Sequence, residues 1–339
     1  MTGSVAFGKH NRNQPKASSS DAGSSEGSRV GDVDACLMVT MRAATVDPPL
    51  RRWLADGLGS VILFGANLRT AADAAAIVRE LRATAPDLLV AVDEEGGDVN
   101  RLERTVGSSY PGNLALGELN DVAATEQIGG ALGDLLAAAG IDLDLAPVAD
   151  VNSNPDNPVI GSRSFGADPA RVAAHTAAYV RGVQSRGVAA CAKHFPGHGA
   201  AATDSHEELP IVDAPADVLS TVDLEPFRAA IAAGARSVMT AHVVYPAWDP
   251  GVPATLSRPI LTDLLRGELG FAGVLITDAL HMAAIRDGVG CAEGAVQALA
   301  AGADLVCVDL DLPGQVAVRD AVAAAVADGR LPAPRVAEA

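Results

Sequence analysis

Eight short apolar runs, separated by longer segments with helical spacing, are the feature that most constrains the fold of this chain. The runs are rich in Val, Leu and Ile and occupy residues 36–41, 60–64, 88–92, 142–146, 188–192, 237–241, 274–277 and 304–308. Alanine-rich helix candidates lie between them, at 71–84, 123–139, 169–186, 224–233, 258–268 and 292–301. Strands that alternate with helices in this way predict parallel βαβ units and an α/β fold.

Eight such strands are the number that closes a TIM-type (β/α)8 barrel. We therefore predict one catalytic barrel domain over residues 31–330. A doubly wound open sheet is the alternative fold, but no Gly-x-Gly-x-x-Gly follows the first strand. Residues 1–30 are rich in Ser, Gly and Asn, which predicts a disordered tail. Residues 331–339 are expected to be a C-terminal tail that resembles the start of a further helix, and so of a segment beyond residue 339.

Charge and hydropathy narrow the class of partner. The net charge of −17 and the pI of about 4.7 argue against nucleic acid and against anionic membranes. No apolar run reaches the ~18 residues that a membrane helix needs. No apolar core follows the basic residues near the N-terminus, so we expect a cytoplasmic protein, with secretion open if the native N-terminus has been altered. The four cysteines lie far apart and are expected to be buried hydrophobes.

Polar side chains follow the apolar runs, at the strand ends where a TIM barrel builds its active site. Lys193 is the only lysine after the first 30 residues, and it lies just after the fifth run, where we expect the strand to end and a loop to begin. The polar residues that we expect to meet on this rim are Asp93, Arg101, Arg163, Lys193, His194, Asp204, His206 and Asp278. Their spacing is not that of a cysteine–histidine metal site.

Each of these residues also has a purely structural interpretation. A lone Asp93 or Asp278 after a strand is suited to capping the next helix. Arg163 is suited to an ion pair with an acidic rim. Several other polar residues are expected to be solvated or structural (Glu94 and Glu95), to shape the loop (His198), or to be bystanders within helices (His175 and His281).

The residue types favour glycosidase chemistry. A carboxylate nucleophile with a separate proton donor is the arrangement that cleaves glycosidic bonds. Asp278 is the candidate nucleophile, and His206 is the candidate general acid/base because imidazole titrates near neutrality. Asp204, two residues before His206, is suited to orienting that imidazole. No phosphate-binding loop, nucleophile elbow or cofactor fingerprint is present.

Five motifs resemble glycoside hydrolase family 3, in particular its β-N-acetylglucosaminidases. They are Lys-His-Phe-Pro-Gly-His-Gly at 193–199, Asp-Ser-His at 204–206, Asp-x-Glu-Gly-Gly-x-Val-x-Arg at 93–101, Ile-Gly-x-Arg-Ser-Phe at 160–165 and Thr-Asp-Ala-Leu-x-Met at 277–282. The resemblance extends from about residue 33 to residue 310, with the motifs in the order typical of the family. One departure is His281, at a position where smaller or acidic residues are usual.

The resemblance implies an exo-enzyme that removes terminal β-linked N-acetylglucosamine with retention of configuration. By this resemblance Asp278 is the nucleophile, His206 the acid/base and Asp204 its partner. The implied sugar-binding set is Asp93, Arg101, Arg163, Lys193 and His194. The implied ligand is an N-acetylglucosamine-containing oligosaccharide or a peptidoglycan fragment, with chitin oligosaccharides also open, and no cofactor is implied.

Three alternatives stay open at this point. Phosphate in place of water would make the protein a β-N-acetylglucosaminide phosphorylase. Ligation by His194, His198, Asp204 and His206 would make it a metal-dependent hydrolase. A barrel that binds sugar without catalysis is the third alternative. We also predict that the loop at 197–206 is more mobile than the strand ends and closes over bound sugar.

Overall fold

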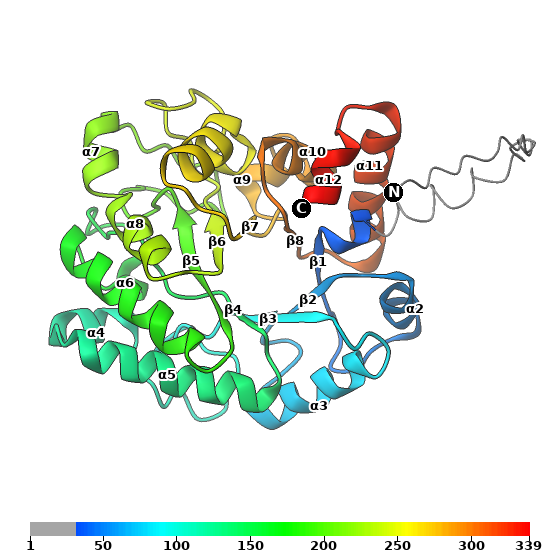
Figure 1. Ribbon diagram of the computed structural model, residues 1–339, viewed down its shortest axis with the longest axis horizontal. Helices are drawn as coiled ribbons and strands as arrows, with labels where there is room; N and C mark the ends of the chain where they lie inside the picture. Colours follow the sequence, from blue (N-terminus) through cyan, green and yellow to red (C-terminus); the bar gives the residue numbers. More distant parts are fainter. Residues whose placement is uncertain (1–31) are drawn as a thin grey trace, which may run out of the picture.

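The computed structural model describes residues 32–339, and the predicted tail at 1–30 lies outside the described residues. Eight parallel strands form one sheet in the order β7-β6-β5-β4-β3-β2-β1-β8, and a bridge between Ile276 and Leu305 joins its two ends (Figure 1). The strands are β1 (Leu37–Thr40), β2 (Ser60–Leu63), β3 (Leu89–Val92), β4 (Leu143–Asp144), β5 (Ala189–Phe195), β6 (Ser237–Thr240), β7 (Val274–Ile276) and β8 (Val306–Val308). The predicted (β/α)8 barrel is confirmed.

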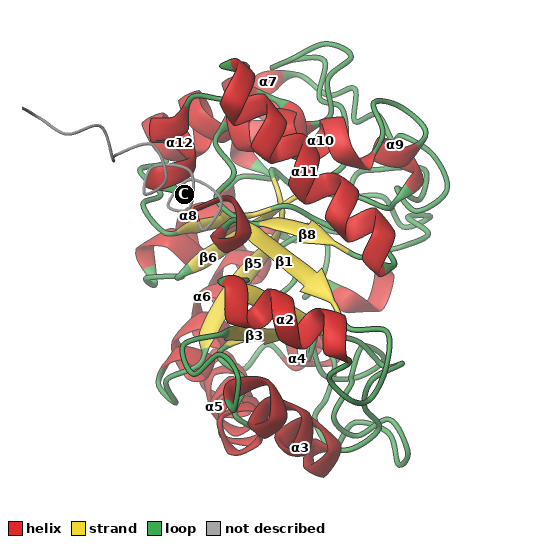
Figure 2. Ribbon diagram, turned by 90° about the vertical axis from the view of Figure 1, so that its right-hand side faces the viewer, coloured by secondary structure: helices red, strands yellow, loops and turns green. Residues whose placement is uncertain are grey.

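Helices surround the strands (Figures 1 and 2). They are α2 (Pro48–Asp56), α3 (Ala71–Arg82), α4 (Asn113–Leu119), α5 (Val122–Ala139), α6 (Pro169–Gln184), α7 (Ala216–Thr221), α8 (Glu225–Ala232), α9 (Ala283–Arg286), α10 (Cys291–Ala301), α11 (Leu312–Asp328) and α12 (Ala333–Glu338). Short 3-10 turns are η1 (Gly161–Arg163) and η2 (Ala254–Leu256), and η3 (Pro259–Glu268) winds as a π-helix. The last residues, predicted as a tail, include α12.

The core has two layers that follow from the alternation of side chains along each strand. In β1, Met38 points into the barrel and joins Ile62 and Cys191 there, whereas Val39 belongs to the layer between strands and helices.

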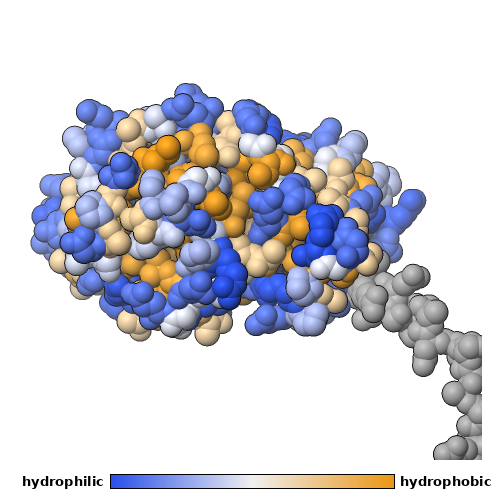
Figure 3. Space-filling model, turned by 90° about the horizontal axis from the view of Figure 1, so that it is seen from above, coloured by the Kyte–Doolittle hydropathy of each residue, from blue (hydrophilic) through white to orange (hydrophobic). Residues whose placement is uncertain are grey.

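On the face seen in Figure 3, hydrophilic residues dominate the outline and hydrophobic residues gather toward the middle. Within residues 32–339, no helix has both the length and the apolar character that crossing a membrane requires.

Strand β5 is longer than the sequence predicts. It continues to Phe195, so Lys193 and His194 lie within the strand and not in a following loop. Its pairing with β6 changes register between Ala192 and Phe195. Such irregularities are common next to active sites, where they redirect side chains. The apolar pattern does not predict this extension, because a buried lysine and histidine need partners that only the folded barrel supplies.

Candidate active site

A cavity of about 360 Å³ opens at the carboxyl ends of the strands. Its size and its place are those expected of a small-molecule site in a TIM barrel. Of the eight predicted site residues, seven line it: Asp93, Arg101, Arg163, Lys193, His194, His206 and Asp278. The eighth, Asp204, contacts His206. The structure therefore brings the predicted set together, although its members are up to about 185 residues apart in the chain (from Asp93 to Asp278).

A buried ion cluster forms one wall of the cavity. Lys193 is 2% exposed, and its Nζ lies 2.7 Å from Asp93 Oδ1 and 2.7 Å from Glu95 Oε1. Arg163 donates two parallel hydrogen bonds to Glu95, from Nε to Oε2 at 3.0 Å and from Nη2 to Oε1 at 2.8 Å. Arg101 Nη2 lies 3.8 Å from Asp93 Oδ2. Lys193 is thus shared between the two carboxylates, and each arginine pairs with one of them, so that the five side chains form one connected network.

The charges of this cluster reinforce one another. Burial disfavours the ionised form of Glu95, but the charges of Arg163 and Lys193 outweigh burial and hold the pKa of Glu95 below its usual range. Burial likewise opposes the charge on Lys193, but Asp93 and Glu95 hold the pKa of Lys193 above its usual range. Our prediction that Glu95 is either solvated or structural is correct only in its second part, because Glu95 is 2% exposed and lines the cavity.

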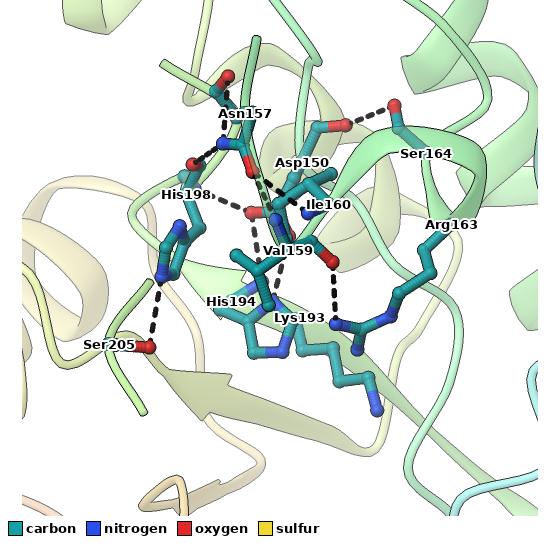
Figure 4. A network of polar contacts seen from close by, with 12 residues as sticks. Asp150, Asn157, Val159, Ile160, Arg163, Ser164, Lys193, His194, His198 and Ser205 are labelled. Carbon is teal, nitrogen blue, oxygen red and sulfur yellow. Dashed lines mark hydrogen bonds and ion pairs between the residues drawn. The ribbon is translucent and has the colours of Figure 1, made fainter. Parts of the chain in front are cut away.

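Asp150 holds two histidines of the site, His194 and His198, in position (Figure 4). Its carboxylate accepts hydrogen bonds from the backbone N–H of His194 at 3.1 Å and of His198 at 2.6 Å, and it binds His194 Nδ1 at 2.7 Å. Burial opposes ionisation, but the imidazole of His194 outweighs it and keeps the pKa of Asp150 below its usual range. With Nδ1 occupied, Nε2 is the ring nitrogen that His194 offers to the cavity. Asp150 is not among the residues that the sequence predicted for the site.

Asp278 lies two residues after the end of β7 and is half-buried. Its Oδ1 accepts a hydrogen bond from the N–H of Ala279 at 2.7 Å. Burial opposes ionisation, but the imidazoles of His242 and His194 outweigh it and hold the pKa of Asp278 below its usual range. The interpretation as a helix cap is wrong, because α9 begins after Met282. Asp278 is therefore an ionised carboxylate that faces the cavity and does not cap a helix.

His206 and Asp204 form a hydrogen-bonded dyad at the mouth of the cavity. His206 Nδ1 lies 2.6 Å from Asp204 Oδ1, and the His206 N–H donates to the same oxygen at 2.9 Å. The His206 side chain is 54% exposed. Burial opposes ionisation of Asp204, but the hydrogen bonds from His206 outweigh it and lower the pKa of Asp204. The arrangement leaves His206 Nε2 free to exchange a proton with a bound molecule or with water.

Two histidines that we expected to be bystanders differ in their surroundings. His175 lies buried in α6, with Nδ1 2.7 Å from Thr125 Oγ1, and does not line the cavity, so it is a bystander within a helix as predicted. For His281 the prediction was wrong: it lies in the turn between β7 and α9 and lines the cavity. Its Nδ1 is 3.7 Å from Asp309 Oδ2. The signal that pointed to it was its unusual residue type at this position of the motif.

The histidines proposed as metal ligands have other partners. His194 Nδ1 and His206 Nδ1 each contact an aspartate, and His198 Nε2 lies 3.2 Å from Ser205 Oγ. Within residues 32–339, no three His, Cys, Asp or Glu side chains are grouped so that they can hold a metal ion.

Residues 37–339 match the model of the glycosyl hydrolase family 3 N terminal domain. The chain belongs to glycosyl hydrolase family 3. A Beta-hexosaminidase of Stenotrophomonas maltophilia (strain R551-3) is 40% identical over 280 residues, which are 80% of this chain and 82% of that protein. Beta-hexosaminidase A of Pseudoalteromonas piscicida is 37% identical over 77% of this chain, which covers only 47% of that longer protein.

Solved structures agree with this assignment. A glycoside hydrolase family 3 beta-N-acetylglucosaminidase from Paenibacillus sp. str. FPU-7 superimposes with a TM-score of 0.88 and is 43% identical. The match covers 91% of this family 3 chain and 60% of that protein. The chain therefore spans about half to three-fifths of the longer relatives and about four-fifths of the shorter one.

Proposed function

We propose that this family 3 protein is a retaining exo-β-N-acetylglucosaminidase, a β-N-acetylhexosaminidase that hydrolyses terminal β-linked N-acetylglucosamine. The observation that carries the proposal is that an ionised carboxylate, Asp278, and an imidazole with a free nitrogen, His206, line the same cavity. A carboxylate nucleophile and a separate proton donor are what retaining glycoside hydrolysis requires. The printed names of the relatives, β-hexosaminidase and β-N-acetylglucosaminidase, support the same activity.

In the proposed reaction, Asp278 attacks the anomeric carbon while His206 protonates the departing glycosidic oxygen. That transfer leaves His206 neutral. Water then cleaves the glycosyl ester on Asp278, and neutral His206 takes the proton from this water and so returns to its protonated form. Asp204 holds His206 Nδ1 and stabilises the imidazolium that exists after each proton gain. The lowered pKa of Asp278 serves the first step, because only the ionised carboxylate is a nucleophile.

The ion cluster supplies the binding side of the proposal. Asp93, Lys193 and Arg163 present charged donors and acceptors whose positions are already fixed by their mutual ion pairs. Hydroxyl groups of a terminal sugar are suited to such an array, because charge-assisted hydrogen bonds are stronger than neutral ones. We propose that Arg101 and His194 complete this sugar-binding set, and that the natural substrates are peptidoglycan fragments ending in N-acetylglucosamine.

The test is a product assay with 4-nitrophenyl N-acetyl-β-glucosaminide, run with and without inorganic phosphate. We expect release of nitrophenol and free N-acetylglucosamine in both cases, with Asp278→Ala as the inactive control. Formation of N-acetylglucosamine 1-phosphate in the presence of phosphate would show that the protein catalyses phosphorolysis and not hydrolysis. Absence of turnover by the unmodified protein would contradict the proposed function. Parallel assays on peptidoglycan fragments and on chitobiose decide between the two natural substrate classes.

A further inference from the structure

We infer that Ser205 is a positioning residue, which through His198 and α9 locks the Asp204–His206 dyad in the place where proton transfer occurs. The inference rests on the proposed function and adds residues to which that function assigns no role. Ser205 lies between the two members of the dyad in the sequence, but unlike them it is 2% exposed. The loop therefore buries its central residue while it presents the imidazole beside it to the cavity mouth.

Two contacts from different parts of the barrel hold Ser205. Its Oγ lies 3.2 Å from Nε2 of His198, in the turn after β5 (Figure 4). Its carbonyl oxygen accepts a hydrogen bond from the N–H of Ala284 at 3.3 Å, in the first turn of α9. Helix α9 follows the turn that carries Asp278, so the second contact ties the dyad to the nucleophile's side of the cavity. We call the pair of contacts the Ser205 latch.

The histidine of the latch is itself rigidly held. The N–H of His198 donates to Asp150 at 2.6 Å, and its carbonyl oxygen accepts from Asn157 Nδ2 at 2.9 Å. Its ring packs edge-on against His194, with centroids 5.9 Å apart. Asp150 thus fixes both the sugar-binding His194 and the anchor of the acid/base loop (Figure 4). One buried carboxylate sets the relative positions of the binding edge and the proton donor.

The charge state of His198, as well as its position, suits the Ser205 latch to holding a proton-donating His206. Burial lowers the pKa of His198, so the ring is neutral at neutral pH and adds no positive charge that would repel a protonated His206. A general acid acts only within hydrogen-bond reach of the atom that it protonates, and a displacement of about 1 Å can reduce the rate about 100-fold. Loss of the latch therefore affects proton transfer more than sugar binding.

Leaving groups of different basicity separate these two effects. We compare kcat/KM for phenyl and 2,4-dinitrophenyl N-acetyl-β-glucosaminide, since kcat/KM reports the glycosylation step and dinitrophenolate departs without protonation. Ser205→Ala is expected to lower kcat/KM for the phenyl substrate about 10- to 100-fold. For the dinitrophenyl substrate it is expected to change the value less than about twofold. Ser205→Thr keeps the hydroxyl and is expected to retain activity on both substrates.

A second variant and a control accompany this measurement. His198→Asn, whose amide is too short to reach Ser205, should reproduce the selective loss even if Ser205→Ala folds poorly. Thr203→Ala removes a hydroxyl from the same loop and should leave both substrates unaffected. Equal losses on the two substrates, or no loss from either latch variant, would overturn the inference. If the unmodified protein turns over neither substrate, the proposed function itself fails.

Discussion

Asp223 provides a quantitative test of the packing beneath the site. It lies between α7 and α8 and is 3% exposed, and its Oδ1 has no hydrogen-bond partner within residues 32–339. Gly197 passes so close that a Cβ atom there would lie 2.7 Å from Asp223 Cβ. Burial, and after it the negative charge of Asp150, raise the pKa of Asp223 to about 7. The folded protein therefore retains a proton that the unfolded chain releases near pH 4.

The expected change in stability follows from this difference in pKa. Because the pKa is raised on folding, the contribution of Asp223 is most favourable at or below the ordinary pKa of 3.8 and declines as the pH rises to about 7. The full difference corresponds to about 4 kcal/mol of unfolding free energy. About 2.5 kcal/mol of it falls between pH 5 and pH 8. Asp223→Asn has no proton to lose and does not undergo this decline.

The assay is urea denaturation of the unmodified protein and of Asp223→Asn at pH 5 and at pH 8. We expect the stability of the variant relative to the unmodified protein to increase by about 2.5 kcal/mol between the two pH values. The exposed Asp213→Asn serves as the control and should follow the unmodified protein at both. If Asp223→Asn loses as much stability as the unmodified protein between pH 5 and pH 8, the raised pKa and the burial argument behind it are wrong.

Four further predictions concern the loop and the cavity. Asp278→Ala should abolish turnover of aryl N-acetylglucosaminides, and retention of most of the activity would refute its role as nucleophile. His206→Ala should lower kcat/KM for the phenyl substrate by about 10²–10⁴, measured by phenol release. Gly199→Ala would place a Cβ 1.8 Å from the Val151 carbonyl oxygen. We therefore expect the free energy of unfolding, measured by thermal or urea denaturation, to fall by about 1–3 kcal/mol. Gly267→Ala is the control that should be tolerated, because its added Cβ meets only one atom, at 3.5 Å. His281 lines the cavity and its side chain is 38% exposed, so we expect it to contact the departing sugar of a disaccharide. His281→Ala should then raise KM for a disaccharide about fivefold, the loss of about one hydrogen bond, and leave KM for the phenyl substrate unchanged; equal effects on both substrates would contradict this contact.

The fold was predictable because the barrel is built from repeated local units. A short apolar run followed by a helical segment identifies each βα unit in the sequence. Because the connections between parallel strands are right-handed, few topologies of the sheet then remain possible. The limits of β5 were not predictable in the same way. Lys193 and His194 belong to the strand because of their carboxylate partners, and one of these, Asp93, lies 100 residues away in the chain.

The site was predictable as a set of residues but not as a network. Motifs placed Asp278, His206 and the binding residues on one rim, whereas the tasks of Glu95 and Asp150 depend on which strands become neighbours. Glu95 is buried because Lys193 and Arg163 reach it from β5 and from the loop after β4. A sequence position next to a strand end does not reveal such pairings, since burial of a charge is decided by partners distant in the chain.

The most direct test of the central claim is mass spectrometry of the protein after reaction with a 5-fluoro N-acetylglucosaminyl fluoride, whose fluorine slows hydrolysis of the glycosyl ester. We expect one added sugar per chain, located by peptide analysis on Asp278, and no adduct on Asp278→Ala. Turnover of the reagent without any adduct, or an adduct on a different residue, would contradict the assignment of Asp278 as the nucleophile.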